Sequence, residues 1–284
     1  MSKKISELFT VATHRTGVHW LEVVKASQCS YLNRTCIKSR KSRPDIAIGT
    51  CTVGYGANKD VIICPHRLLE RKQIFTDCYH LLTLHEPGNE LHKLSEITVP
   101  GGSVDYMLIS AKVNGGNRKV IDFVGIELQT LDTTGTVWPE RERFLASQGV
   151  PVDPDDTKNT KPYGMNWKMT AKTILVQLHH KIKTFEHLGK HFVLVMQGHL
   201  LDYMEKEFNF SCIQAAKVGD SMHFHAYDLK EAKDHYYLEL KARKSTDSDG
   251  IAACLGQKAD PKVELSEIIK ALESNLSDDS LLTV

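Results

Sequence analysis

An aspartate, a glutamate and a glutamine lie on two β-like segments that follow each other in the sequence. Asp105 lies in SVDYMLIS at 103–110, and Glu127 and Gln129 lie in VIDFVGIELQT at 120–130. Residues two apart on a strand point to the same face, so Glu127 and Gln129 project together. The turn-forming NGGN at 114–117 predicts an antiparallel hairpin, which brings Asp105 close to them.

Two carboxylates on neighbouring strands have the chemistry of a magnesium site. Mg²⁺ prefers carboxylate and phosphate oxygens, and it can hold a scissile phosphate and acidify a bound water. We therefore expect Asp105 and Glu127 to bind Mg²⁺ and Gln129 to orient the water. The competing interpretation is a polar outer face at Glu127 and Gln129. The apolar character of both segments opposes it, because an acid on such a strand is costly unless it is paired or ligated.

A further carboxylate is expected from the segment before the hairpin. NELHKLSEITV at 89–99 starts with an Asn that can cap a helix and ends at a Pro-Gly-Gly turn, so it predicts a short helix. Glu90, near the start of this segment, is the candidate for a supporting acid. Glu96 is the competitor, but six residues later it would lie on roughly the opposite side of the helix.

Five of the seven cysteines lie within 50 residues of one another. Thiolates grouped in a reducing compartment favour tetrahedral zinc or iron over a disulfide framework. We expect Cys29, Cys36, Cys51 and Cys64 to hold one structural metal, with Cys78 as the alternative to Cys29. Their spacings lack the paired CxxC of a zinc ribbon, and the other interpretation is that each is a small buried hydrophobe.

Positive charge is concentrated near the start of the chain. The first 80 residues hold 13 Lys and Arg against six Asp and Glu, although the net charge of the chain is +1. Such a surplus suits a polyanionic partner such as a nucleic acid, in which Arg can match guanine in the major groove. Phosphate contacts or simple solvation are the alternatives for any one residue. The candidates crowd the expected loop RTCIKSRKSRPD: Arg34, Lys38, Arg40, Lys41 and Arg43.

Helices must cover the hairpin, and the strongest helical pattern lies beyond it. Apolar residues recur at spacings of four and three between Asn166 and Gly189, which predicts a long helix with one buried face. Residues 191–197 and 221–230 are predicted strands, 200–208 a helix, and the Pro- and Asp-rich stretch 138–166 a surface excursion. The predicted fold is α/β (α+β), a mixed sheet flanked by helices. The face residues are Ala171, Leu175, Leu178, Ile182 and Phe185.

Composition predicts an ordinary globular protein, with 41% apolar and 25% charged residues. No apolar run approaches the roughly 20 residues that cross a bilayer, and the start MSKKISELF lacks a signal peptide's features, so we expect a cytoplasmic protein with no membrane partner. We divide the chain into a basic cysteine-rich metal-binding module at 1–80, a catalytic core at 81–245, and a polar, acidic tail with a short helix at 246–284.

The hairpin segments and the cysteine-rich segment together resemble a known family. PGGSVDYMLIS followed by IDFVGIELQT resembles the PD-(D/E)XK nuclease core, in the variant with Gln in place of the usual Lys. The cysteine segment leading to IGTCTVGYG and VIICPHRLLERKQIF, together with GMNWKMTAKTILVQLHHKI, resembles NotI-type (EagI-like) restriction endonucleases over roughly residues 25–210. The missing Lys leaves open how the attacking water is activated.

The resemblance implies a Mg²⁺-dependent type II restriction endonuclease. It assigns metal binding to Asp105 and Glu127, water positioning to Gln129, a supporting role to Glu90, and iron, or else zinc, to the cysteines. It also implies a GC-rich, GGCC-centred palindrome cut to 5′-phosphate ends with 5′ overhangs. Because one hairpin site cuts one strand, a double-strand break requires a homodimer.

Two other functions remain open at the level of sequence. One is a repair or junction-cleaving nuclease of the same superfamily, which would respond to DNA structure instead of sequence. The other is a non-catalytic DNA-binding regulator stabilised by its cysteine metal. Asp105 and Glu127 argue against a regulator, because carboxylates beside phosphates repel DNA unless a metal neutralises them.

Overall fold

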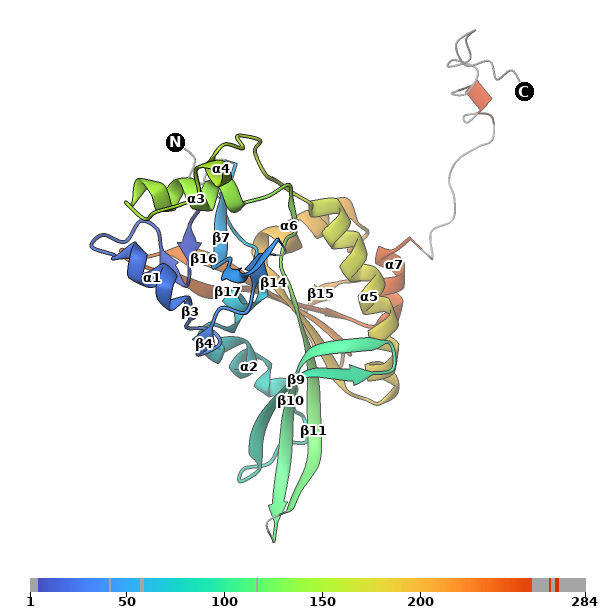
Figure 1. Cartoon of the computed structure of the whole chain (residues 1–284). Helices are drawn as coiled ribbons and strands as arrows, with labels where there is room; N and C mark the ends of the chain where they lie inside the picture. Colours follow the sequence, from blue (N-terminus) through green and yellow to red (C-terminus); the bar gives the residue numbers. More distant parts are fainter. Residues whose placement is uncertain are drawn as a thin grey trace.

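A mixed β-sheet of seven strands forms the centre of the molecule (Figure 1). The computed structural model describes residues 5–40, 42–56, 59–115, 117–256, 266 and 269–270. The strand order is β15-β17-β16-β14-β11-β10-β9. Strand β14 is parallel to β11 and β16, and the other neighbours are antiparallel. The strands are β9 (Glu90–Val99), β10 (Gly102–Asn114), β11 (Asn117–Gln129), β14 (His191–Gln197), β15 (Gln214–Ala215), β16 (Met222–Glu231) and β17 (Tyr236–Thr246).

Helices cover both faces of this sheet, as the side chains of β14 show. Phe192, Leu194 and Met196 pack in one hydrophobic cluster, whereas Val193 and Val195 pack in another on the opposite face. The first face carries α5 (Trp167–His187), α6 (Gly198–Glu207) and α7 (Ser248–Cys254), and the second carries the 3₁₀ turns η1 (Pro65–Lys72) and η2 (Tyr79–Leu81) with α2 (Gln73–Cys78). The predicted mixed sheet flanked by helices is confirmed.

Helix α5 confirms the strongest sequence prediction. It begins one residue after Asn166 and buries the predicted apolar face, with exposed fractions of 1% or less for Ala171, Leu175, Leu178, Ile182 and Phe185. The predicted strand at 191–197 and the predicted helix near 200–208 are also present as β14 and α6. A 3.6-residue pattern of this length specifies one buried face, which is why the prediction was accurate.

Strands β10 and β11 form the predicted antiparallel hairpin. Their register runs from Tyr106 opposite Ile126 to Asn114 opposite Asn117, with one irregularity after Ser110. Each strand is 13 residues long, and their turn end projects from the body of the molecule (Figure 1). The hairpin therefore carries Asp105 at its base, next to the helices.

The helix expected at 89–99 is wrong, because these residues form the edge strand β9. They pair antiparallel with β10, from Val99 opposite Gly102 to Glu90 opposite Ala111. The Pro-Gly-Gly turn folds the chain back so that its backbone N–H and C=O groups complete the sheet. This pairing outweighs the local preference for a helix.

The cysteine-rich residues before β9 build a smaller sheet and two short hairpins. The four-stranded sheet has the order β2-β1-β7-β8, and Leu8, Val53 and Val61 join the same hydrophobic cluster as α5. The N-terminal region thus shares its core with the rest of the molecule. Its elements are β1 (Glu7–Leu8), β2 (Val11–Ala12), α1 (Trp20–Ala26), β3 (Gln28–Cys29), β4 (Arg34–Thr35), β5 (Ser39–Arg40), β6 (Arg43–Ala47), β7 (Thr50–Tyr55) and β8 (Lys59–Ile62).

The stretch 138–166 is more ordered than the predicted surface excursion. It contains α3 (Trp138–Ser147), α4 (Pro154–Thr157) and β13 (Gly164–Met165), which pairs with β12 (Thr133–Thr134). The Arg141 guanidinium lies 4.4 Å from the centre of the Trp138 ring, and its Nε donates to the Ile48 carbonyl at 2.7 Å. Ile48 lies 93 positions from Arg141, so no periodic pattern in the sequence predicts this contact.

The end of the described chain packs on α5. Helix α7 is capped by the Asp247 carboxylate, which accepts a hydrogen bond from the Gly250 amide at 2.8 Å. Most of the short helix predicted beyond residue 262 lies outside the described residues. Among the residues that the structure describes, no helix is long and apolar enough to cross a membrane.

Candidate functional site

Asp105 and Glu127 lie on neighbouring strands, and Glu127 is on the sheet face that α5 covers. The neighbouring pair, Tyr106 opposite Ile126, sets the register that brings them together. The face is fixed by Gly125, because a Cβ placed there would lie 2.5 Å from the Phe185 ring on α5. Glu127, two residues later, shares that face. The Asp105 Oδ2 accepts a hydrogen bond from the Leu128 amide at 2.8 Å, which holds its carboxylate against β11.

The two oxygens of Glu127 have different surroundings. Its Oε1 accepts a hydrogen bond from Lys181 Nζ on α5 at 2.8 Å, and the side chains are 12% and 8% exposed. Its Oε2 is buried and has no hydrogen-bond partner among the described residues. Burial raises the pKa of Glu127; the Lys181 hydrogen bond opposes this rise and the Asp105 charge adds to it.

The turn before β10 packs directly on α5 beside this pair. Thr184 Oγ1 donates to the Pro100 carbonyl at 2.9 Å. Gly101 has φ +97°, and a Cβ on it would lie 2.7 Å from the His180 carbonyl oxygen. On Gly102 a Cβ would meet Lys181 Cε at 3.3 Å. Glycine is therefore required here by close approach as well as by backbone conformation.

Gln129 and Glu90 occupy different places relative to the pair. Gln129 lies two residues beyond Glu127 on the same strand, and its Nε2 donates to the Thr130 carbonyl at 2.6 Å. Glu90 lies opposite Ala111, six residues along β10 from Asp105, a separation of about 20 Å. There its Oε2 accepts from Arg118 Nε at 2.6 Å. The hydrogen bond from Arg118 lowers the pKa of Glu90. The structure does not bring Glu90 to the carboxylate pair.

Glu96 takes the position across from Asp105. Its neighbours Ser95 and Ile97 pair with Tyr106 and Val104, so Glu96 and Asp105 face each other in the register. Glu96 is exposed and has φ +57°, a conformation in which a non-glycine residue interrupts regular pairing. The helical phase that favoured Glu90 over Glu96 does not apply to a strand.

The carboxylate pair fits a hard divalent cation. A buried carboxylate oxygen without a partner carries a desolvation cost that a cation would offset. The neighbouring Asp105 adds oxygen of the type that Mg²⁺ prefers. Within the described ranges, no group of three or more His, Cys, Asp or Glu side chains is arranged to hold a metal ion. Water or phosphate oxygens would therefore have to complete the coordination of a metal at this pair.

Four cysteines line one small enclosed cavity of about 10 Å³. These are the predicted residues Cys29, Cys36, Cys51 and Cys64, of which Cys36 alone is half-buried and the others are buried. Burial raises the pKa of Cys51, and the charge of a Cys64 thiolate would raise it further. A cavity of this size holds about one atom-sized sphere. The structure therefore places thiols that are widely spaced in the sequence around one cavity, but among the described residues they do not form a group arranged to hold a metal ion.

Cys78, the alternative to Cys29, lies elsewhere. It is fully buried in the hydrophobic cluster on the α2 side of the sheet, with its Sγ 3.7 Å from His225 Nδ1. It does not line the cavity of the other four cysteines. Of the two alternatives in the sequence prediction, Cys29 therefore lines the cavity and Cys78 does not.

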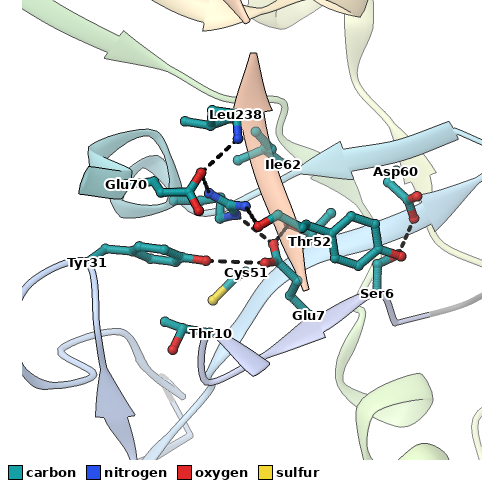
Figure 2. A network of polar contacts seen from close by, with 12 residues as sticks. Ser6, Glu7, Thr10, Tyr31, Cys51, Thr52, Asp60, Ile62, Glu70 and Leu238 are labelled. Carbon is teal, nitrogen blue, oxygen red and sulfur yellow. Dashed lines mark hydrogen bonds and ion pairs between the residues drawn. The ribbon is translucent and has the colours of Figure 1, made fainter. Parts of the chain in front are cut away.

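A buried ionic network lies beside Cys51 (Figure 2). Arg67 is fully buried, and its Nε donates to Glu7 Oε2 at 2.8 Å while its Nη1 lies 3.1 Å from Glu70 Oε2. The Arg67 Nη2 donates to the Tyr236 carbonyl at 3.0 Å, so the network joins the N-terminal sheet to β17. Arg67 is one of the 13 basic residues counted in the first 80 positions, but it is buried and therefore adds no positive charge to the surface.

Two of the predicted DNA-contacting residues are already paired within the chain. Arg40 Nη2 lies 2.9 Å from Asp156 Oδ1 on α4, and Arg43 Nη2 lies 3.0 Å from Asp153 and 3.1 Å from Asp156. Lys38 Nζ donates to the Ile63 carbonyl at 3.2 Å, and Arg34 is exposed on β4. Lys41 lies outside the described residues. Sequence reasoning missed the acidic partners, which lie more than 100 positions away.

Comparison with known proteins gives one result that covers most of the chain. Residues 29–239 match the sequence model of a family described as Restriction endonuclease NotI. No curated protein matches the chain. The matched range includes the carboxylate pair and the four cysteines of the cavity.

Proposed function

The chain belongs to the NotI restriction endonuclease family, and from this we propose that it is a type II enzyme whose Asp105 and Glu127 hold the Mg²⁺ for DNA hydrolysis. Family membership carries the general activity, cleavage of double-stranded DNA. The single observation that supports the assigned site is the buried, unpartnered Oε2 of Glu127 beside Asp105. Such an oxygen is poised to accept a cation.

The residues of the site divide the work as follows. Bound Mg²⁺ would lower the pKa of a water and neutralise charge on the attacked phosphate. Asp105, fixed by the Leu128 amide, presents its second carboxylate oxygen, and Glu127 presents Oε2. Gln129 donates its Nε2 to Thr130, which leaves its Oε1 as an acceptor that can orient a water. Glu96 replaces Glu90 as the proposed supporting acid because of its register opposite Asp105.

The topology supports a PD-(D/E)XK-like core built on β9, β10, β11, α5 and β14. The supporting features are the hairpin that carries both carboxylates and the parallel strand that follows α5. For the substrate we propose a GC-rich, GGCC-centred palindrome cut by a homodimer to 5′-phosphate ends with 5′ overhangs, as in EagI-like enzymes. Two-fold symmetric DNA presents each strand in the same way to each protomer.

We propose that the cysteine cavity binds one structural iron or zinc ion. The support is that four cysteines line one cavity, since four thiolates are the ligand number of a tetrahedral sulfur site; the side chains as they stand in the described residues do not form a metal-binding group and would have to move together. Cys51 and Cys64 would have to lose their protons to bind, and the positive charge of a metal would oppose the burial that raises the pKa of both thiols. Metal analysis of the purified protein tests this, and fully active protein without iron or zinc would contradict it.

For DNA contact we propose the basic segment from Arg34 to Arg43. Arg34 is exposed and can contact a phosphate or a guanine directly. Arg40 and Arg43 must first break their ion pairs with Asp153 and Asp156. An exchange of carboxylate for phosphate keeps the hydrogen-bonding geometry of the guanidinium. Lys38 and Lys41 complete the proposed set.

The decisive experiment is digestion of a defined plasmid with Mg²⁺ by wild type, Asp105→Ala and Glu127→Ala, followed by sequencing of the ends. We expect wild type to give uniform ends at one palindrome. Both variants should lose cleavage by more than about 100-fold and keep DNA binding, because the metal ligands are lost but the contact surface remains. Normal turnover by either variant contradicts the site, and scattered ends favour the repair nuclease.

A further inference from the structure

Lys181 is a buried cation on the otherwise apolar face of α5. Its flanking residues Leu178 and Ile182 are fully buried, and Lys181 itself is 6% exposed. A buried ammonium group is costly unless it is paired. Its partner is Glu127, through the 2.8 Å contact between Nζ and Oε1. No simple packing requirement places a lysine in this apolar stripe.

The alignment of α5 with β11 fixes this contact. Phe185 lies over Gly125, and Lys181, four residues earlier, meets Glu127, two residues later. Four residues of helix and two of strand each advance by about 6 to 7 Å, so the two elements stay in step. The turn at Gly101 and Gly102 closes on the same part of α5. The alignment of α5 with β11 and with this turn therefore places the Lys181 ammonium beside Glu127.

The contact leaves the carboxylate of Glu127 with one occupied and one free oxygen. Lys181 holds Oε1, while Oε2 is buried without a partner among the described residues. The strand itself supplies no charge of this kind, because Gln129 is neutral and bonds to its own neighbour Thr130. The positive charge beside the carboxylate pair thus comes from α5.

We infer that Lys181 is a positioning residue of the catalytic site. It fixes the carboxylate of Glu127 with Oε2 directed to the metal, and its ammonium adds a fixed positive charge beside the phosphate under attack. A preorganised charge of this kind stabilises the negative charge that develops in the transition state. This inference rests on the proposed function, since it takes Asp105 and Glu127 as the metal ligands.

The test compares Lys181→Met, Lys181→Gln and Lys181→Arg with wild type. Lys183→Met is the matched control, because Lys183 is an exposed lysine of the same helix. Three quantities are measured: Tb³⁺ binding by luminescence, the single-turnover cleavage rate at saturating Mg²⁺, and thermal unfolding. Lys181→Gln keeps a hydrogen-bond donor and serves if the methionine variant does not fold.

We expect Lys181→Met and Lys181→Gln to bind Tb³⁺ at least as tightly as wild type, because a positive charge that repels the cation is gone. Their cleavage rate should fall by about 100-fold or more, the usual loss for one preorganised donor. Lys181→Arg should recover at least tenfold of that loss, and Lys183→Met should match wild type. A purely structural lysine would instead lower stability and leave the rate at saturating Mg²⁺ unchanged.

Two outcomes overturn the inference. One is a wild-type cleavage rate in the folded glutamine or methionine variant. The other is loss of Tb³⁺ binding in that variant to the level of Glu127→Ala. The lysine would then be needed only to keep the metal-binding site folded, and not for the cleavage step. Failure of the proposed function looks different, since Asp105→Ala and Glu127→Ala would then cleave normally.

Discussion

At the scale of single residues, the position of an acid in the sheet register decides whether it can serve the site. Glu90 and Glu96 lie on the same edge strand, yet Glu90 pairs with Arg118 near the far end while Glu96 faces Asp105. Both are exposed or half-buried, so neither is needed for the hydrophobic core. Glu90 and Glu96 are the same residue type, and they differ in their distance from Asp105 along the sheet.

Glu96→Ala should therefore reduce cleavage more than Glu90→Ala. We expect a loss of at least tenfold at limiting Mg²⁺ for Glu96→Ala, because a carboxylate near the metal is removed, and a change below threefold for Glu90→Ala. Initial rates over a range of Mg²⁺ concentrations measure both. A larger loss in Glu90→Ala than in Glu96→Ala would return the supporting role to Glu90.

At the scale of elements, segments with a periodic pattern or a turn signal of their own were predictable, and segments whose structure depends on partners outside them were not. The face of α5 and the hairpin of β10 and β11 followed from spacings of 3.6 and 2 residues and from the NGGN turn. Strand β9 was missed because its structure comes from its neighbour β10. Helix α3 was missed because Arg141 and Trp138 contact Ile48 and Arg40, which lie far away in the chain. Lys181 went unnoticed for the same reason, since its contact with Glu127 spans 54 positions.

Strand β16 carries two histidines that should make the fold sensitive to acid. His223 and His225 are 1% and 0% exposed, and burial, the largest cause, lowers their pKa values to about 4 and about 3. Both stay neutral in the folded protein, whereas the unfolded chain takes up protons below its ordinary pKa of 6.5. Their stabilisation is thus complete above pH 6.5 and is lost as the pH falls toward 4.

His225→Gln should reduce this acid lability. Between pH 6.5 and pH 4, the fall in the free energy of unfolding should be smaller than in wild type by about 3 kcal/mol, because one group no longer takes up a proton on unfolding. Urea unfolding at several pH values measures it. His180→Gln, which changes an exposed histidine, is the control. An unchanged pH dependence in His225→Gln would show that the loss has another origin.

At the scale of the whole molecule, charge that is separated in the sequence is combined in the fold. The basic segment meets the acidic helix α4, which lies beside the N-terminal strands (Figure 1). Asp156 contacts both Arg40 and Arg43 and is nearly buried at 12% side-chain exposure. Part of the positive surplus is therefore neutralised within the chain, and at the proposed contact segment DNA would have to compete with a carboxylate.

Asp156→Asn should strengthen DNA binding several-fold and steepen its salt dependence. Release of Arg40 and Arg43 provides up to two more phosphate contacts, and each adds about 0.9 to the logarithmic salt slope. Asp155→Asn is the matched control, because it removes the same charge from the same helix but pairs with Lys158. Binding is measured by fluorescence anisotropy on a short duplex. Equal effects of both variants would mean that Arg40 and Arg43 stay in place as structural residues.

The Arg67 network also sets an order of events during synthesis on the ribosome. Arg67 donates to the carbonyl of Tyr236, and Glu70 accepts from the amide of Leu238 at 2.7 Å, partners made 169 and 168 positions later. At about 5 to 20 residues per second, the ribosome needs roughly 10 to 30 s to supply them. Until then the guanidinium beside Cys51 lacks its last acceptor. Asp105, Glu127 and Lys181 are all synthesised before that moment, so the residues of the proposed site precede by several seconds the contacts that join the N-terminal sheet to β17.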